Sequence, residues 1–315
     1  MPLEMLREPL TPLGLHYLLI HFDIPEMPDD RLAIGDRSFT LDELRSRERV
    51  TLPVTLECAG NGRALLGAAA PSQPWLNEAV GTAEWTGTPL APLLRETGLD
   101  SAVEIVFEGA DRGIQGGVEH AYARSLPVEE ALRDDVLLAW EMNGAPLLPQ
   151  HGAPLRLVVP GWYGMTHVKW LTSIRALDGA FDGWQQTDAY KIDDVPVQRI
   201  EPRALMIPPG IPEFLSRERF AEPGAHTLRG RAWSGYAPIE RVEVAVDGEW
   251  RDAELEAPLG AYAWRGWSFE WAATPGEHEL RCRATDASGR TQPDVAAWNH
   301  GGYSNNSVQV VRVKV

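Results

Sequence analysis

The sequence predicts a mixed α+β domain followed by an all-β, immunoglobulin-like sandwich. Residues 1–205 combine helix-capping patterns with short β-rich runs and glycine-rich loops, without the regular strand and helix alternation of a doubly wound sheet. Residues 195–224 contain six prolines, which exclude a regular helix or strand. Beyond this connector, apolar and polar residues alternate as in strands with one buried face. The expected domains are therefore residues 1–205 and 206–315.

Local signals in the first domain predict short helices and short strands. Thr40 and Glu43 have the spacing of a capping box, which starts a helix. Pro89 and Gly98 enclose an apolar stretch and predict a helix with a proline start and a glycine stop. A further helix is expected after Pro127. Strands are predicted where β-branched and leucine residues gather, at 50–56, 103–107 and 155–159.

The second domain shows strand patterns almost throughout. Alternating valines at 242–246 end at Asp247-Gly248, a hairpin turn signal. Similar alternation occurs at 280–284 and 311–315, and short strands joined by turns at this spacing are typical of a sandwich. Cys282 falls on an apolar face and is expected to be a core residue. Three aromatic residues of one strand region are expected to form either core or interface: Trp264, Trp267 and Trp271.

The charge and cysteine content limit the classes of partner. Acidic residues outnumber basic ones, 45 against 29, for a formal net charge of −16. This balance disfavours nucleic acids and anionic membrane surfaces, which select for basic patches, although a few cations in a cleft can still bind an anionic substrate. Cys58 and Cys282 are the only cysteines, so neither a disulfide framework nor a CxxC metal site is expected.

The N-terminal region lacks the pattern of a secretory signal. Residues 1–12 carry Glu4, Arg7 and Glu8, and the apolar stretch 13–22 is interrupted by histidines and too short to span a bilayer. We expect a cytoplasmic protein without a membrane partner. A periplasmic location would follow if a leader had been removed from the mature chain.

Cys58 is the residue that points most directly to chemistry. By strand parity it continues the apolar face of Leu56, which by itself favours a buried structural thiol. It is followed by a glycine-rich turn that ends in Arg63, where the backbone can approach a bulky ligand and a cation favours the thiolate. Soft thiolates bind transition metals well, so Cys58 is a candidate metal ligand.

A second cluster of polar and basic residues lies at 151–171. If residues 166–171 are extended, His167 and Lys169 project from one face of the strand. Together with Arg156, an imidazole and an ammonium are suited to bind phosphate or another anion. A solvated strand face is the alternative for Lys169 alone.

These motifs, in this order, resemble the sulfite oxidase family of molybdopterin-dependent oxidoreductases. The segment 57–63 reads ECAGNGR, similar to the signature of that family around its metal-binding cysteine. The resemblance continues through the motifs GTAEWTG (81–87), EMNG (141–144), HGAPLR (151–156), PGWYG (160–164), HVKWL (167–171), WQ (184–185), YK (190–191) and WN (298–299). It covers nearly the whole chain and implies a molybdopterin-binding catalytic domain followed by a dimerisation domain.

The resemblance also implies roles for individual residues. Cys58 matches the thiolate ligand of molybdenum. Residues matching positions that hold the pterin and its phosphate are Tyr17, Leu18, Leu19, Ile20, His21, Asp111, His151, Arg156, His167, Val168 and Lys169. Tyr190 and Arg63 match catalytic residues that bind the substrate, and Trp75 matches a tryptophan of the substrate pocket.

Two positions depart from the family pattern. Sulfite-binding members have an arginine where this chain has Leu19, and a second arginine in the C-terminal loop where this chain has His300. Of three expected anion-binding arginines only Arg63 remains, with His300 or Lys191 as a candidate replacement. Since a charge-assisted hydrogen bond contributes about 1.5–3 kcal/mol, the loss of two is expected to weaken sulfite binding strongly.

The predicted function is therefore two-electron oxygen-atom transfer at a molybdenum–molybdopterin cofactor, with an oxyanion such as sulfite as the small-molecule substrate. No haem motif is present, so an external electron acceptor is expected, and the resemblance favours a homodimer. Alternatives are a molybdenum-dependent reductase of an oxyanion or sulfoxide, and a metal-independent thiol hydrolase with Cys58 as nucleophile and His151 or His21 as base. A scaffolding module would leave the basic cluster unexplained.

Overall fold

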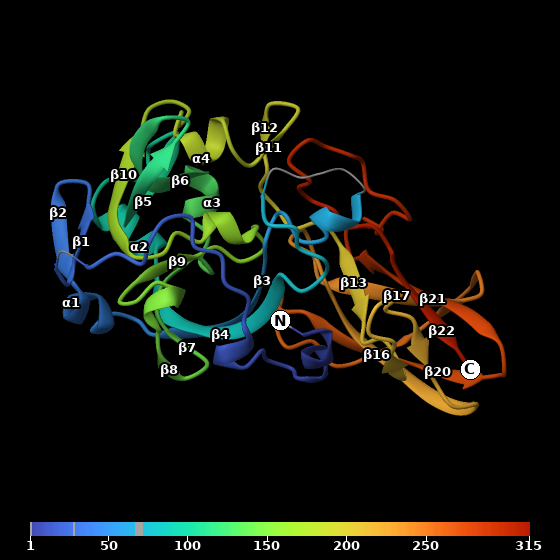
Figure 1. Ribbon diagram of the computed structural model, residues 1–315. Helices are drawn as coiled ribbons and strands as arrows, with labels where there is room; N and C mark the ends of the chain where they lie inside the picture. The colour runs from blue at the N-terminus through green and yellow to red at the C-terminus, as the bar shows by residue number, and fades with distance from the viewer. Residues whose placement is uncertain (1, 28, 67–71) are drawn as a thin grey trace. The chain divides into compact units, whose positions relative to one another are not determined.

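The computed structural model describes residues 2–27, 29–66 and 72–315, and consists mostly of β-strands with a few short helices (Figure 1). The chain forms two compact units. The first unit contains Tyr17–Ala59 and Ala83–Gln198, and the second contains Met1–His16, Gly60–Thr82 and Arg199–Val315. No helix in the described part of the chain is both long enough and apolar enough to cross a lipid bilayer.

Two sheets build the first unit. One has the strand order β2-β1-β10-β5-β6, and the other has the order β3-β4-β7-β8 with β9 paired to β7. Within the first sheet, β1 and β10 are parallel and the other pairs are antiparallel. The strands are β1 (Arg31–Ile34), β2 (Arg37–Thr40), β3 (Val50–Glu57), β4 (Val80–Pro89), β5 (Glu104–Gln115), β6 (Val118–Pro127), β7 (Leu137–Met142), β8 (Ala145–Pro146), β9 (Arg156–Val158) and β10 (Leu171–Leu177). A separate hairpin pairs β11 (Lys191–Ile192) with β12 (Val195–Pro196).

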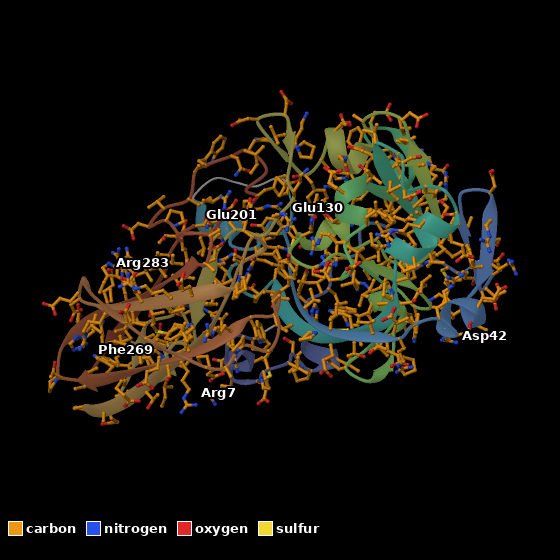
Figure 2. All side chains as sticks on the ribbon, turned by 180° about the vertical axis from the view of Figure 1, so that it is seen from behind. Arg7, Asp42, Glu130, Glu201, Phe269 and Arg283 are labelled. Carbon is orange, nitrogen blue, oxygen red and sulfur yellow. The ribbon has the colours of Figure 1, made fainter. Side chains whose placement is uncertain are left out.

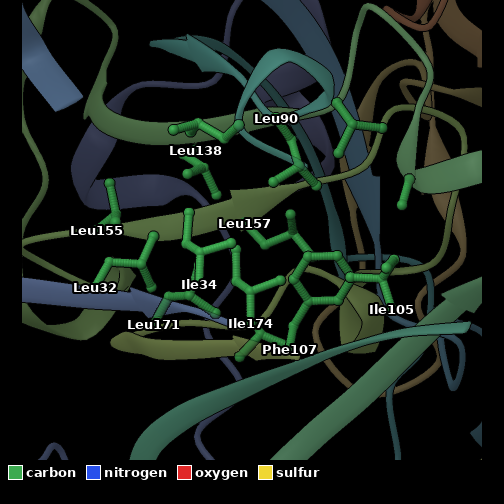
Figure 3. Close-up of a cluster of buried hydrophobic side chains, with 14 of the residues drawn as sticks. Leu32, Ile34, Leu90, Ile105, Phe107, Leu138, Leu155, Leu157, Leu171 and Ile174 are labelled. Carbon is green, nitrogen blue, oxygen red and sulfur yellow. The ribbon is translucent and has the colours of Figure 1, made fainter. Parts of the chain in front are cut away.

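Aliphatic side chains from both sheets form the core of this unit. Figure 3 shows Ile34, Phe107 and Ile174 of the first sheet facing Leu138 and Leu157 of the second, and all five are buried. Removing this much apolar surface from water is the main stabilising contribution to the unit. The result is a firm support for the loops that leave the strand ends.

The helices follow the local signals closely. They are α1 (Leu41–Arg45), α2 (Ala91–Glu96), α3 (Val128–Ala131) and α4 (Trp184–Thr187), with 3-10 turns η1 (Leu3–Arg7), η2 (Leu13–Leu15), η3 (Arg63–Leu66), η4 (Pro149–His151) and η5 (Gly164–Thr166). The predicted capping box at Thr40 and Glu43 is present in both directions. Helix α2 stops before Gly98, which has a positive φ of 70°. The expected proline start at Pro89 is wrong, because Pro89 ends β4 and the first-turn proline is Pro92.

Residues 166–171 are not extended, so the condition for a shared strand face of His167 and Lys169 is not met. His167 is the C-cap that follows the 3-10 turn η5, Trp170 has a positive φ of 49°, and β10 begins only at Leu171. The Val168 amide donates to the Thr166 carbonyl at 2.9 Å, while the Val168 carbonyl accepts from the Leu157 amide at 2.8 Å. His167 and Lys169 therefore do not share a strand face, and each reaches its surroundings from a looped backbone.

The second unit contains a β-sandwich. Its sheets have the orders β13-β16-β20-β19 and β14-β15-β22-β21-β17-β18. The strands are β13 (Arg203–Met206), β14 (Ile211–Pro212), β15 (Arg219–Phe220), β16 (Gly224–Trp233), β17 (Ile239–Val246), β18 (Glu249–Asp252), β19 (Glu254–Leu255), β20 (Arg265–Ala273), β21 (Glu277–Asp286) and β22 (Gln309–Lys314). Asp247 and Gly248 form the expected hairpin turn between β17 and β18, with φ values of 52° and 92°.

Side chains from both sheets fill the sandwich. Trp267, Phe269 and Trp271 of β20 pack with Cys282 of β21, and Phe269 is labelled in Figure 2. The tryptophans therefore belong to the core, as does Cys282, which is fully buried as predicted. Trp264 is also buried, and its indole donates to the Pro9 carbonyl at 2.7 Å.

Candidate functional site

Cys58 follows the last residue of β3 and is a free thiol with 5% of its surface exposed. All four preceding residues, 54–57, are buried, so both faces of this end of the strand are covered. Tyr17 lies near enough to Cys58 for their charges to interact. Burial first, and then the neighbouring Cys58, raise the pKa of Tyr17 well above its usual value. The phenol therefore stays protonated and can donate a hydrogen bond beside the sulfur.

A glycine makes room for this tyrosine. A β-carbon at Gly164 would collide with the Tyr17 hydroxyl. Gly164 begins η5, the turn that leads into His167 and Lys169. The glycine-rich loop 161–164 therefore connects the thiol region with the basic cluster.

Arg156 is a buried cation. The two groups that accept hydrogen bonds from its guanidinium are backbone carbonyls. Its Nη1 donates to the His151 carbonyl at 2.8 Å, and its Nη2 donates to the His167 carbonyl at 3.3 Å. The guanidinium also stacks 4.6 Å from the ring centre of Trp85. Burial lowers the pKa of Arg156 to about 10, and the nearby Tyr17 opposes this change.

Lys169 is a second enclosed cation close to the first. Its Nζ donates to the carbonyls of Leu19 at 3.0 Å and Gln150 at 3.4 Å, and lies 4.2 Å from the ring centre of Trp170. Burial, followed by repulsion from Arg156, lowers the pKa of Lys169 to about 7. Two like charges held together away from water create a strong preference for an anion between or beside them.

Unsatisfied polar atoms support this interpretation. In the described part of the chain, the Arg156 Nε and the Asp111 Oδ1 are buried without a hydrogen-bond partner. Burial raises the pKa of Asp111 to about 6, and Lys169 opposes the rise. Because buried polar atoms in native proteins are nearly always paired, these atoms indicate that a polar group belongs at this place.

The low pKa of Lys169 predicts a pH dependence for the cofactor-free chain. Between pH 7 and 10.5 the folded chain loses the Lys169 proton while the unfolded chain keeps it. The free energy of unfolding should therefore rise with pH across this window, whereas affinity for an anion that needs the ammonium should fall by up to about tenfold per pH unit. Thermal unfolding and anion binding, each measured from pH 6 to 10, test the two opposite trends.

The control for this prediction compares two lysine variants. Lys169→Met should remove both trends. Lys314→Met should retain them, because the carboxylate of Glu218 raises the pKa of Lys314 instead of lowering it. Equal pH profiles for wild type and Lys169→Met would contradict the assignment.

His21 and Tyr190 form a hydrogen-bonded pair, between the His21 Nε2 and the Tyr190 hydroxyl. His21 also packs on Tyr122, with ring centres 4.7 Å apart. Burial, followed by repulsion from Lys169, lowers the pKa of His21 to about 4, so this imidazole is neutral at pH 7. Tyr190 has a positive φ of 49°, an unusual backbone conformation for tyrosine that places its side chain against His21.

His167 is fixed by its own loop. Its Nδ1 accepts from the Val159 amide at 3.1 Å, and its Nε2 donates to the Trp162 carbonyl at 3.0 Å. The ring is therefore neutral and oriented by the backbone. The carbonyl of His167 accepts a hydrogen bond from Arg156. The side chain of the neighbouring Val168 is fully buried in the hydrophobic core, so only its backbone is available to a ligand.

Arg63 belongs to the second unit. It is buried and donates through Nη1 to the Gln73 carbonyl at 3.3 Å, and its guanidinium lies 5.1 Å from the ring centre of Tyr303. A β-carbon at Gly60 or Gly302 would approach Arg63 to 2.7 Å or less, so both glycines make room for this arginine. Two distant segments of the sequence therefore enclose one cation.

The other expected substrate residues of this unit come from the segment after Arg63 and from the C-terminal loop. The Trp75 carbonyl accepts from the Ala64 amide at 3.0 Å, next to Arg63. His300 is exposed, in a loop closed by Asn299, whose side chain bonds both the amide and the carbonyl of Tyr303. The structure thus groups Arg63, Trp75 and the His300 loop in the second unit, and Tyr190 with His21 in the first.

The loop that follows Cys58 is anchored by residues that the sequence analysis did not predict as site residues. Arg203 donates to the Asn61 carbonyl at 3.2 Å and to the Asn77 side chain at 2.6 Å, and Asn305 donates to the Gly62 carbonyl at 2.6 Å. These contacts join residues 61, 62 and 77 to the strands and C-terminal loop of the second unit. The compact units therefore do not follow a single cut at residue 205.

Two aromatic residues of the first unit were also not predicted as site residues from the sequence. They are Trp85, beside Arg156, and Tyr122, beside His21. Trp85 lies in the GTAEWTG motif, so the motif contained a signal for it. Tyr122 has no local signal, because its role follows only from the pairing of β5 with β6.

Comparison with known proteins gives a consistent result. Residues 23–185 match the oxidoreductase molybdopterin binding domain, and residues 195–315 match the Mo-co oxidoreductase dimerisation domain. Mouse (Mus musculus) mitochondrial sulfite oxidase is 33% identical over 350 residues, covering 100% of this chain and 63% of that protein. Chicken (Gallus gallus) sulfite oxidase is 37% identical over 338 residues, covering 96% of this chain and 72% of the relative.

Relatives of other types align as well. Nitrate reductase [NADH] 1 of Arabidopsis thaliana is 32% identical over 359 residues, covering 97% of this chain and 38% of that protein. The solved structure of the sulfane dehydrogenase SoxCD from Paracoccus pantotrophus superposes with a TM-score of 0.81 at 28% identity, covering 97% of this chain and 81% of that one. The chain spans 63% of the length of the mouse and human sulfite oxidases.

Fold and site together define a cofactor-dependent oxidoreductase domain joined to a β-sandwich. A buried thiol, two enclosed cations and unsatisfied buried polar atoms fit a molybdenum pterin with an anionic phosphate. The chain belongs to the sulfite oxidase family of molybdopterin-dependent oxidoreductases.

Proposed function

We propose that this chain catalyses two-electron oxygen-atom transfer to sulfite or a related small substrate, and passes the electrons to an external acceptor. The observation that carries the proposal is the buried Cys58 thiol beside Tyr17, in the unit that also encloses Arg156 and Lys169. This arrangement provides one protein thiolate for a metal and a basic cradle for the phosphate of its organic scaffold.

Each part of the cofactor has candidate partners on this chain. Cys58 would ligate molybdenum, and Arg156 and Lys169 would bind the pterin phosphate. The pterin would be held by the backbone of 17–20, by the loop carbonyls of His151 and His167, and by the region of His21, Asp111 and Val168. When bound, this cofactor supplies a two-electron redox centre that exchanges an oxygen atom with the substrate.

The substrate is positioned by the remaining residues. Tyr190, oriented by the neutral His21, would direct its hydroxyl to a substrate oxygen. In the second unit, Arg63 would neutralise an anionic substrate, and Trp75 and His300 are the candidate substrate residues of the same unit. The removal of water around the enclosed groups would strengthen each of these electrostatic interactions.

Purified full chain from a molybdate-supplied host tests the proposal. Stoichiometric molybdenum and turnover of sulfite with an artificial acceptor are the expected results. The nitrate reductase relatives support a second candidate, reduction of an oxyanion, which an assay with a reduced dye and candidate oxides would reveal. Absence of molybdenum together with hydrolase activity would overturn both and favour the thiol hydrolase.

Restoring the missing arginine should improve sulfite binding. Leu19→Arg is expected to lower the KM for sulfite by about 10- to 100-fold, because one charge-assisted hydrogen bond contributes about 1.5–3 kcal/mol. Leu15→Arg, at an exposed apolar position of the same segment outside the residues proposed to hold the pterin, serves as the matched control and should leave the KM unchanged. A KM that fails to respond to arginine at 19 would indicate that the natural substrate is not bound through this position.

We further propose the organisation of the whole protein. The sandwich would have immunoglobulin-like topology, the functional domains would be residues 1–205 and 206–315, and the protein would act as a cytoplasmic homodimer. Support comes from the two-sheet core and from the match of residues 195–315 to a dimerisation domain.

A further inference from the structure

One buried arginine is hydrogen-bonded to both ends of the segment that carries Tyr190. Arg124 of β6 has only 1% of its surface exposed. It donates through Nη1 to the Gln185 carbonyl and through Nη2, at 3.2 Å, to the Val197 carbonyl. Because a buried charge is costly unless it is hydrogen-bonded, the guanidinium and the two carbonyls hold one another in place. Arg124 therefore joins the beginning of segment 185–197 to its end.

The backbone connects these contacts to Tyr190 itself. The Val197 amide donates to the Tyr190 carbonyl at 2.8 Å, and the carbonyl of the same Val197 accepts from Arg124. On the other side, the Ala189 amide next to Tyr190 donates to the Trp184 carbonyl at 2.9 Å. The guanidinium thus reaches the Tyr190 backbone through a single residue, Val197.

Tyr190 has a backbone conformation that tyrosine does not favour. Its φ of 49° lies in the left-handed region, as do the φ values of Asp193 and Asp194, at 49° and 63°. A tyrosine keeps such a conformation only where the surrounding structure fixes it. The double contact with Arg124 supplies this constraint, because it closes the segment that contains all three residues.

Strand β6 supports both members of the hydrogen-bonded pair of His21 and Tyr190. Residues 122 and 124 are two positions apart in this strand, so their side chains project from the same face. The Tyr122 ring packs against the His21 ring, with centres 4.7 Å apart. The Arg124 guanidinium holds the segment of Tyr190, whose helix α4 lies beside β6 (Figure 1). One strand face therefore sets the positions of both the imidazole and the phenol.

We propose that Arg124 is a positioning residue that acts through Tyr190, whose hydroxyl it keeps aligned with the His21 imidazole and the substrate. Both acceptors of its hydrogen bonds are backbone carbonyls of the Tyr190 segment, so Arg124 acts by holding the backbone. A displacement of about 1 Å at a reacting group can lower a rate by about 100-fold. The inference rests on the proposed function, because it takes Tyr190 as a residue that contacts substrate.

Turnover of the molybdenum-loaded full chain tests this role. Arg124→Met should lower kcat for sulfite by about 10- to 100-fold and change the KM by less than about threefold, because the alignment of the hydroxyl matters most in the transition state. Molybdenum content per chain should remain that of wild type. Arg124→Lys keeps the charge but lacks the guanidinium fork, so its kcat should lie between those of wild type and Arg124→Met.

A double-mutant cycle separates positioning from general damage. In a Tyr190→Phe background, where the hydroxyl is already absent, Arg124→Met should lower kcat further by less than about twofold. Losses that multiply independently would overturn the proposal. Leu44→Ala is the matched control for lost stability, because Leu44 is fully buried in the core of the same unit. It should lower the Tm and leave kcat unchanged.

Nuclear magnetic resonance of the full chain purified without cofactor gives a measurement that does not depend on turnover. With isotope-labelled histidine, the His21 ring nitrogen is identified as the resonance that shifts in Tyr190→Phe, which lacks the hydroxyl bonded to it. The same resonance should shift in Arg124→Met and stay unchanged in Leu44→Ala. An unchanged His21 resonance in Arg124→Met would overturn the inference. A wild type without molybdenum or sulfite turnover, in which the His21 resonance still responds to Arg124→Met, would contradict the proposed function alone.

Discussion

Replacing Cys58 with serine is expected to leave no detectable turnover while the chain stays folded. Serine has nearly the same volume but is a much poorer ligand than thiolate for a soft metal centre. Because only one small buried atom changes, we expect the free energy of unfolding to change by about 1 kcal/mol. Steady-state assays with sulfite and an artificial acceptor, combined with thermal unfolding of the same samples, measure the two effects.

Cys282→Ala is the matched control for this prediction. Cys282 is fully buried in the sandwich, and burial raises its pKa far above that of a free thiol, so it is not a thiolate at neutral pH. Its replacement should lower stability slightly and leave molybdenum content and turnover unchanged. Normal turnover by Cys58→Ser would refute the assignment of the metal ligand.

The Arg156→Met variant is expected to be purified without bound cofactor. The substitution keeps much of the aliphatic length and removes the guanidinium that faces the proposed phosphate. A charge-assisted pair of hydrogen bonds contributes about 3 kcal/mol or more, so affinity for the pterin should fall at least about 100-fold. Molybdenum and pterin contents of the purified variant, expressed per chain, are the measurements.

The control is another arginine in a similar setting. Arg124 is also buried in the first unit, and it donates to the carbonyls of Gln185 and Val197. Arg124→Met should reduce stability, because it too leaves buried carbonyls unpaired, but should retain the cofactor. If both variants lost cofactor equally, the effect of Arg156 would be structural and the phosphate assignment would fail.

Local physical chemistry made several elements predictable from the sequence. The capping box at Thr40 needs only residues within one helical turn, and the turn at Asp247-Gly248 needs only its own backbone preference. The alternation around Cys282 identified a buried strand face for the same reason. The motif around Cys58 also identified the family, because the other motifs of the family follow it in the expected order along the chain.

Residues 166–171 show the limit of such reasoning. The pattern there was compatible with a strand, but the structure uses a tight turn followed by a positive φ at Trp170. Two sets of hydrogen bonds stabilise this conformation. The Trp170 indole donates to the Pro149 carbonyl, and the His167 ring is hydrogen-bonded to backbone groups of 159 and 162. These partners are identified only once the fold brings the segments together.

The sequence by itself determined the family, the thiol and the basic residues, because each is carried by residue type and order. Only the tertiary structure decided that Tyr190 meets His21 across 169 residues, and that the loop after Cys58 joins the second unit through Arg203 and Asn305. It also decided the altered pKa values of Lys169 and His21. The reason is physical: desolvation and long-range pairing depend on which side chains exclude water from a given point, and local sequence does not specify that arrangement.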